Sequence, residues 1–559
     1  MKKQLLLIVM LLSTAASAIA VEVEIDGLWY DVNTETNEAT VIKYKNDVKY
    51  NGYIVIPETV VYEGVTYSVT TIGNEAFRGC TGLYSIFIPS SVNSIESMAF
   101  CYCINLSSVT IPNSVKTIGT GAFSECKGLT SISISNNVTS LEYCVFAYCN
   151  SLTSITIPNS VKRIDRDAFM YCSELTSITI PNGVTTIGET AFQECTRLTS
   201  ITIPGSVTSI GDNAFLQCKG LSSVNIMDLG SWCKINFHGI ASNPLYYAHH
   251  LFLNGEEIKN MEIPNDVRYI REYAFGGCSG LTSVTIPGSV NCIERNAFEA
   301  CNGLTSIEIL NGVTSIESQA FEGCSSLTSI TIPSSINSIE TFAFHGCNNL
   351  ASIVVESGNT KYDSRDNCNA IVETSSNTLI LGCCNTVIPN SVTTIGNGAF
   401  FYLSSLISII IPNGVVNIDW SAFSCCTNLT SVIIGSGVRK INGYAFDYCY
   451  ELTDVYCYAE NVPSTGTDVF ENTPIGNATL HVPASSVNKY MTTKPWKYFK
   501  EVVVLSDSDP KPTRVKAIES QDMAKVSIYD ISGHRIADTN KGLNIIRMSD
   551  GTTKKVVVK

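Results

Sequence analysis

The sequence predicts a repeat solenoid, a β-rich α/β fold in which 23-residue coils stack on one another with their strands in parallel. Three observations predict it. An Ala-Phe pair recurs every 23 residues, an alternating strand-like segment follows each copy, and 559 residues exceed what one globular core usually holds. The phenylalanines that mark the period are Phe77, Phe100, Phe123, Phe146, Phe169, Phe192, Phe215, Phe275, Phe298, Phe321, Phe344, Phe400, Phe423 and Phe446, with Phe470 as an irregular fifteenth copy.

One unit illustrates the packing. In residues 168–175, Ala168, Cys172 and Leu175 are spaced as on one face of a short helix, and Phe169 adjoins them. Residues 176–181 then alternate apolar and hydroxyl side chains, as a strand with one buried face does. One coil cannot bury its own apolar edge, so the prediction requires neighbouring coils to cover each other.

The unit resembles the BspA-like subgroup of leucine-rich repeats, in which Ile-Gly-x-x-Ala-Phe-x-x-Cys-x-x-Leu-x-x-Ile-x-Ile-Pro recurs. Residues 187–204 match it almost letter for letter, and the resemblance extends over roughly residues 70–456. It implies a leucine-rich-repeat solenoid. It also implies a surface protein, because members occur on oral and gut anaerobes and several are linked to adhesion. No binding residues of the family transfer to positions of this sequence.

The first residues predict export. Lys2 and Lys3 precede the apolar stretch Leu5 to Leu12, and small residues before position 20 offer cleavage sites. We therefore assign 1–20 to a signal peptide and expect a secreted protein at the bacterial outer surface, with no membrane span in the mature chain.

The repeat period and the composition divide the rest of the chain into several predicted parts. The predicted parts are a β-rich N-terminal cap at 21–70, the repeat array at 71–456 with irregular islands at about 227–262 and 354–388, a C-terminal cap at 457–505, a linker at 506–515 and a small β-module at 516–559.

The last module resembles the C-terminal sorting domain of the type IX secretion route. The matching features are Tyr529-Asp530-Ile531-x-Gly533, Lys541-Gly542-Leu543 and the closing residues 554–559, whereas His534 stands where Arg or Gln is usual. The resemblance implies anchoring at the outer surface through the tail. The alternative is a β-module that merely ends the protein.

The first island carries aromatic rings with polar tips, which suit contact with a sugar or a protein. Its candidate ligand contacts are Trp232, Phe237, Tyr246 and Tyr247. The alternative is that these rings pack the interior of an oversized coil. In the second island, Asp363 and Asp366 lack the spacing of a calcium loop, and a polar β-hairpin is the preferred interpretation.

Twenty-two cysteines would usually indicate disulfides in an exported chain. Position favours packing instead, because thirteen of them stand three residues after a register phenylalanine. These are Cys80, Cys103, Cys126, Cys149, Cys172, Cys195, Cys218, Cys278, Cys301, Cys324, Cys347, Cys426 and Cys449. We expect them to be reduced and inert. Among the others, Cys368 with Cys383 or Cys384 is the favoured local pair.

The sequence offers no candidate catalytic, cofactor or metal residue, and the prediction is a protein that is not an enzyme. The six histidines form no zinc motif, and His249-His250 would face opposite ways on a strand. Thirty-six basic and fifty acidic residues leave a formal charge of −14, which argues against binding nucleic acid or anionic lipid.

The predicted function is a cell-surface binding or adhesion protein. The solvent side of the strands would present hydroxyls, and the candidate contacts there are Thr153, Thr156, Thr176 and Thr179. Such a surface suits a host matrix or surface protein, or a glycan, held at many weak points. Two alternatives stay open: a glycan-capture protein that uses the first island, and a structural surface-layer component without a ligand.

Overall fold

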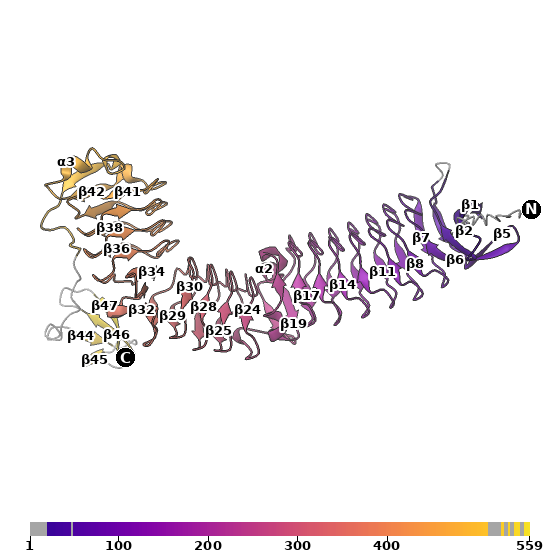
Figure 1. Cartoon of the computed structure of the whole chain (residues 1–559), viewed down its shortest axis with the longest axis horizontal. Helices are drawn as coiled ribbons and strands as arrows, with labels where there is room; N and C mark the ends of the chain where they lie inside the picture. Colours follow the sequence, from indigo (N-terminus) through magenta and orange to yellow (C-terminus); the bar gives the residue numbers. More distant parts are fainter. Residues whose placement is uncertain are drawn as a thin grey trace, which may run out of the picture. The chain divides into compact units, whose positions relative to one another are not determined.

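The computed structural model describes residues 20–45 and 49–512 in full, together with the backbone of four strands between residues 527 and 558. The predicted signal peptide lies outside the described residues, except for Ala20. The chain divides into one compact unit up to Asp507 and a second from Ser508 onward. Coils stack one on the next along the first unit (Figure 1), so the predicted fold class, a solenoid of 23-residue coils with parallel strands, is confirmed.

The main strand column of the first array forms one ten-stranded sheet. Ser154 lies beside Ser177 and Ile155 beside Ile178, so the 23-residue period sets the strand register directly. The strands are β4 (Gly52–Val55), β7 (Leu83–Phe87), β9 (Ser108–Thr110), β11 (Ser131–Ser133), β13 (Ser154–Thr156), β15 (Ser177–Thr179), β17 (Ser200–Ile203), β19 (Ser223–Ile226), β21 (Leu251–Leu253) and β22 (Glu256–Glu257).

Each coil also contributes a two-residue strand, and these short strands pair with one another from coil to coil as a second column. It begins in the N-terminal sheet, whose long strand β6 pairs with β8 in parallel. The strands of that sheet are β1 (Ala20–Ile25), β2 (Leu28–Asn33), β3 (Glu38–Val41), β5 (Thr59–Tyr62), β6 (Val65–Ile72), β8 (Ser94–Ile95) and β10 (Thr117–Ile118). The column continues in β12 (Ser140–Leu141), β14 (Arg163–Ile164), β16 (Thr186–Ile187), β18 (Ser209–Ile210) and β20 (Asn236–Phe237).

Both columns resume after each island. Between the islands the strands are β23 (Asn260–Glu262), β24 (Tyr269–Ile270), β25 (Ser283–Ile286), β26 (Cys292–Ile293), β27 (Ser306–Ile309), β28 (Ser315–Ile316), β29 (Ser329–Ile332), β30 (Ser338–Ile339) and β31 (Ser352–Val355). From the second island onward they are β32 (Tyr362–Asp363), β33 (Ala370–Glu373), β34 (Thr378–Gly382), β35 (Thr394–Ile395), β36 (Ser408–Ile411), β37 (Asn417–Ile418), β38 (Ser431–Ile434), β39 (Lys440–Ile441), β40 (Asp454–Cys457), β41 (Ser464–Thr465), β42 (Thr479–Val482) and β43 (Glu501–Val504).

The Ala-Phe segment is not helical, so the prediction of a short helix was wrong. Asp167 and Tyr171, on either side of Phe169, have φ angles of 58° and 59°, which end a right-handed helix. The Phe169 N–H donates to the Ala191 carbonyl of the next coil over 2.8 Å, while the Ala168 N–H closes a turn within its own coil. Alternate amides therefore hold one coil to the next instead of forming helical bonds.

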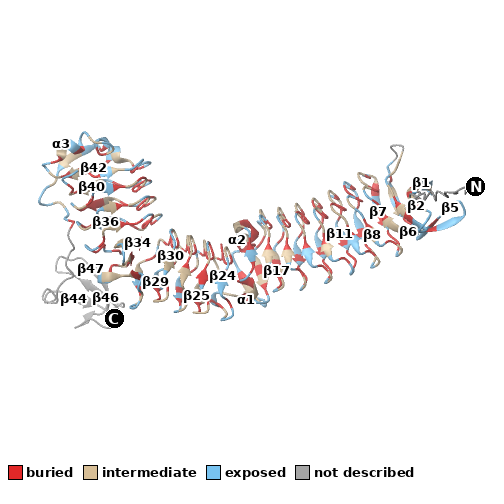
Figure 2. Cartoon of the chain, in the orientation of Figure 1, coloured by how far each residue is buried: buried red, intermediate tan, exposed pale blue. Residues whose placement is uncertain are grey.

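The core is a continuous stack of the repeated apolar side chains. Consecutive register phenylalanines lie parallel, with ring centroids 4.9 to 5.7 Å apart, and their side chains are almost fully buried. Buried and exposed residues alternate along each coil (Figure 2). The second island separates the core into two clusters, one from Leu28 to Cys383 and one from Cys368 to Phe499.

Short helices occur only in irregular segments of the described chain. They are α1 (Leu229–Trp232), α2 (Leu245–Ala248) and α3 (Val487–Tyr490), with 3-10 turns η1 (Ile240–Ser242), η2 (Arg365–Asn367), η3 (Ile475–Asn477) and η4 (Trp496–Tyr498). No helix of this described part is long and apolar enough to cross a membrane. In the second unit, β44 (Ser527–Tyr529), β45 (Arg535–Ile536), β46 (Gly542–Arg547) and β47 (Thr553–Val558) form an antiparallel sheet.

Candidate binding surface

The strand face, defined as the exposed side of strands β9 to β19 in the ten-stranded sheet, carries three columns of small polar residues. Each strand buries its isoleucine or valine side chains and leaves the polar residues between them exposed or half-buried, as Ile155 and Thr156 illustrate. None of these strands contains a charged residue. A ligand on this face therefore meets hydroxyls in register rather than a charged patch.

The predicted threonines of this face are all exposed, but they have different partners. Thr176 Oγ1 donates to the Thr153 carbonyl over 3.2 Å, and Thr199 does the same to Thr176. The hydroxyl hydrogens of Thr176 and Thr199 are therefore engaged in bonds that hold neighbouring coils together. Among the described residues, the hydroxyls of Thr156 and Thr179 have no protein partner, so both can donate to and accept from a ligand.

The first island uses most of its predicted contact residues internally. Trp232 is 1% exposed and its Nε1 donates to the Ala274 carbonyl over 2.8 Å, while Phe237 is 2% exposed and lies edge-on against Trp232. The prediction that these two rings contact a ligand is therefore wrong, because the stacked coils bury both. This burial leaves only the two tyrosines of the island as aromatic candidates for the glycan-capture alternative.

The two tyrosines of the island differ from each other. The Tyr247 hydroxyl accepts a hydrogen bond from the Gln217 amide at 2.9 Å, and its ring packs against the core. Tyr246 is 40% exposed and lies edge-on to Tyr247. His249 and His250 have separate partners, Gly277 and Glu257 respectively. Tyr246 therefore remains as the one predicted aromatic contact of this island with an open surface.

The second island contains the predicted hairpin, formed by the antiparallel pair β33 and β34. Arg365 holds the Asp363 carboxylate through two hydrogen bonds of 2.6 and 2.7 Å, so this acid is engaged within the protein. Cys368 and Cys383 contact different carbonyls, at Ala370 and Asn369, and both are free thiols. Cys384 is also free. The favoured pairing of Cys368 with one of them is not formed.

The repeated cysteines are buried and hydrogen-bonded. Eleven of the thirteen donate from Sγ to the carbonyl of the register phenylalanine in the preceding coil, as Cys172 does to Phe146 over 3.2 Å. Burial raises the pKa of Cys172 to about 12 and that of Cys195 well above its ordinary value. These side chains are therefore protonated at neutral pH, and a protonated thiol is a poor nucleophile.

Among the described residues, no set of three or more His, Cys, Asp and Glu side chains is close enough to hold a metal ion.

Sequence reasoning missed two groups of exposed aromatics. Tyr84 and Phe87 occupy strand positions that hold serine or threonine in later coils, and Tyr53 of β4 lies 6.5 Å from Tyr84 between ring centroids. Their exposed fractions are 51%, 59% and 83%. Trp420 and Tyr448 belong to a second group of exposed rings, which lie within three residues of a register phenylalanine in the last coils. Tyr84 and Trp420 stand at repeat positions that hold a polar residue or glycine in most other copies, whereas the position of Tyr448 holds tyrosine in four other copies.

The coil length, the parallel strand columns and the buried leucine and isoleucine ladder define a leucine-rich-repeat solenoid. The chain belongs to the BspA-type leucine-rich repeat family, whose model matches residues 64–175, 162–236, 247–370 and 382–493, with six copies of the repeat per model. A comparison with curated proteins gave no match.

Several solved structures are similar. A leucine-rich repeat protein from Bacteroides ovatus is 23% identical over 86% of this chain and 100% of that one, with a TM-score of 0.43. A leucine rich cell surface protein from Faecalibacterium prausnitzii is 20% identical over 87% and 96%, with a TM-score of 0.30. The pneumococcal vaccine antigen PcpA is 13% identical over 88% and 100%, with a TM-score of 0.24. The family assignment rests on the family model alone.

Proposed function

We propose that this chain is an exported cell-surface protein that binds a host protein or glycan through the strand face. The observation that carries the proposal concerns Thr156 and Thr179, which lie at the same position of neighbouring coils. Their hydroxyls have no protein partner among the described residues, and their strands are held in register. Each hydroxyl contributes little alone, but a long partner engages many of them at once and gains by multivalency. The lack of charge on these strands favours partners recognised by hydrogen bonds.

The test is binding of the purified mature chain to immobilised host matrix proteins and mucins. We expect saturable binding to at least one of them. The double variant Thr156→Arg/Thr179→Arg should weaken it at least 10-fold, because two long charged side chains cover the hydroxyl columns. The matched control is Thr185→Arg/Thr208→Arg, which changes two exposed threonines that directly precede β16 and β18 of the second column. Equal losses in both variants, or no binding, would refute the proposal.

The route to the surface is a second part of this proposal. The resemblance of Tyr529-Asp530-Ile531 and of residues 554–559 to a sorting domain supports outward transport through the tail, although Asp530 and Ile531 lie outside the described residues. A chain truncated after Val504 in its native host should accumulate, folded, in the periplasm, because the core described above ends at Phe499. Surface protease shaving measures this, and unchanged surface display would make the tail an ordinary β-module.

A further inference from the structure

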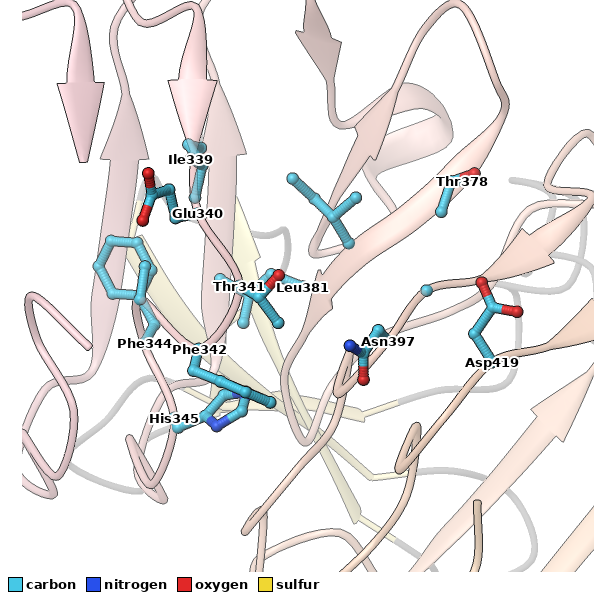
Figure 3. A pocket seen from close by; sticks show the side chains of 13 residues that line it. Ile339, Glu340, Thr341, Phe342, Phe344, His345, Thr378, Leu381, Asn397 and Asp419 are labelled. Atoms are coloured by element: carbon cyan, nitrogen blue, oxygen red, sulfur yellow. The ribbon is translucent and has the colours of Figure 1, made fainter. Parts of the chain in front are cut away.

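A cavity of about 160 Å³ opens where the second island interrupts the stacking of the coils. Residues 339–345 line one side, and β34 with Gly396, Asn397 and Asp419 lines the other. Figure 3 shows Glu340 and Phe344 on one side of it, with Asn397 and Asp419 opposite. The site lies on different coils from the strand face.

The cavity exists because the ladder between Ala-Phe segments stops there. Phe321 N–H donates to the Ala343 carbonyl over 2.8 Å, as the other coils do, but the next Ala-Phe pair after Phe344 comes only at Phe400. Three rings pack in part of the gap: the Phe342 and His345 centroids are 4.1 Å apart, and His345 lies 4.7 Å from Phe401. The remaining space is the cavity, with Phe342 as an apolar wall.

The polar lining suits a ligand with several hydroxyls. Thr341, Thr378 and Asn397 offer hydroxyls and an amide. Glu340 accepts from the Ser318 amide with one oxygen, and Asp419 accepts from the Asn442 side chain with one. The second oxygen of each carboxylate has no partner in the described part of the chain and can accept from a ligand.

Charge restricts the ligand further. Among the described residues that line the cavity there is no lysine or arginine, whereas there are two carboxylates. An anionic sugar, a phosphate or a sulfate would therefore meet repulsion without a compensating cation. A neutral ligand that donates hydrogen bonds fits the lining.

An exposed indole follows the lining residue Asp419 directly in the chain. Trp420 occupies, one coil further on, the repeat position of Asn397, and the Gly398 amide donates to the Trp420 carbonyl over 3.0 Å. A Cβ atom at Gly443 would come within 2.4 Å of the six-membered part of the indole, so the ring lies directly against this glycine. Trp420 is nevertheless 47% exposed. Its supported ring therefore presents apolar surface to solvent.

We propose that the cavity and the Trp420 ring together bind a neutral glycan, with one sugar ring in the cavity and a neighbouring one against the indole. A pyranose ring combines hydroxyl-bearing edges with an apolar C–H face, which match the carboxylate and amide lining and the aromatic surface respectively. The volume is below the roughly 300–1,000 Å³ typical of sites for drug-sized ligands, so the enclosed part holds a single ring. This inference does not depend on the strand face.

The experiment uses the mature full chain and a panel of immobilised polysaccharides. The neutral members are a glucan, a mannan, a galactan and a xylan, and the acidic members are polygalacturonate and heparin. We expect retention on at least one neutral polymer, with affinity reduced at least 10-fold in Trp420→Ala and also reduced in Asn397→Ala. Tyr53→Ala is the matched control, because Tyr53 is an exposed ring at the far end of the first array.

Three outcomes would overturn the inference: no retention on any neutral polymer, retention on the acidic polymers alone, or equal binding by Trp420→Ala and the wild type. Thermal unfolding of each variant checks that the coils remain folded. The Thr156→Arg/Thr179→Arg variant should keep its affinity for the neutral polymer that Trp420→Ala fails to bind, so failure here is distinguishable from failure of the proposed function.

Discussion

Phe169→Ala tests the stacked core most sharply. The ring is fully buried and lies between two others, with centroids 5.6 Å from Phe146 and 5.4 Å from Phe192. Replacing a buried phenylalanine by alanine costs roughly 3–5 kcal/mol, since the transfer free energy is lost and a cavity remains. The upper part of that range applies here, because two ring–ring contacts are lost at once and each contributes about 0.5–1.5 kcal/mol beyond burial.

The assay is urea unfolding followed by circular dichroism, together with hydrogen exchange of the coils around residue 169. Because each coil contacts only its neighbours, exchange should accelerate most in the coils of Phe146, Phe169 and Phe192 and less in distant ones. Phe169→Leu should cost less than Phe169→Ala, since it leaves a smaller cavity although it also loses both ring–ring contacts. A loss no larger than that of the exposed Ser177→Ala control would refute the stacked-core reasoning.

The other predictions concern titration and thiol reactivity. Burial lowers the pKa of His345 from 6.5 to about 3, so the folded protein keeps a neutral imidazole while the unfolded chain is protonated below pH 6.5. The neutral His345 contributes fully to the free energy of unfolding above pH 6.5, and this contribution falls as the pH drops toward 3, by about 2 kcal/mol at pH 5. Urea unfolding above pH 6.5 and at pH 5 should show a smaller loss of stability in His345→Gln than in the wild type. An identical loss in the two proteins would contradict the prediction. Alkylation followed by mass spectrometry should label the half-buried Cys384 and Cys425 in the native protein and the repeated cysteines only after unfolding, whereas a bridged Cys149 or Cys172 would overturn the packing interpretation.

The repeat period predicted the architecture because the period equals the spacing of residues that pair between neighbouring strands. A residue and its copy 23 positions later lie side by side, as Ser177 and Ser200 do, so the pattern fixes which side chains stack and which face outward. The exposure of Thr156 and Thr179 followed from the same alternation. Features that repeat with the coil could therefore be read from the chain.

Features that depend on contacts between coils could not be read in this way. The spacing of Ala168, Cys172 and Leu175 fits a helix, but amides such as that of Phe169 bond to the next coil, which no local pattern reveals. Trp232 has both an apolar ring and a polar N–H, so its sequence context does not distinguish a surface contact from a buried ring bonded to Ala274. The cavity arises from the length and folding of the second island, and its lining joins residues up to 80 positions apart, from Ile339 to Asp419.

The most direct test of the central claim is site-specific photo-crosslinking on the strand face. A photoreactive residue at Thr179 should become covalently joined to the matrix protein or mucin that the mature chain captures. The same residue at Lys162, which is exposed but lies outside the strand face, should give little product. Crosslinking from Lys162 with none from Thr179 would contradict binding through the strand face.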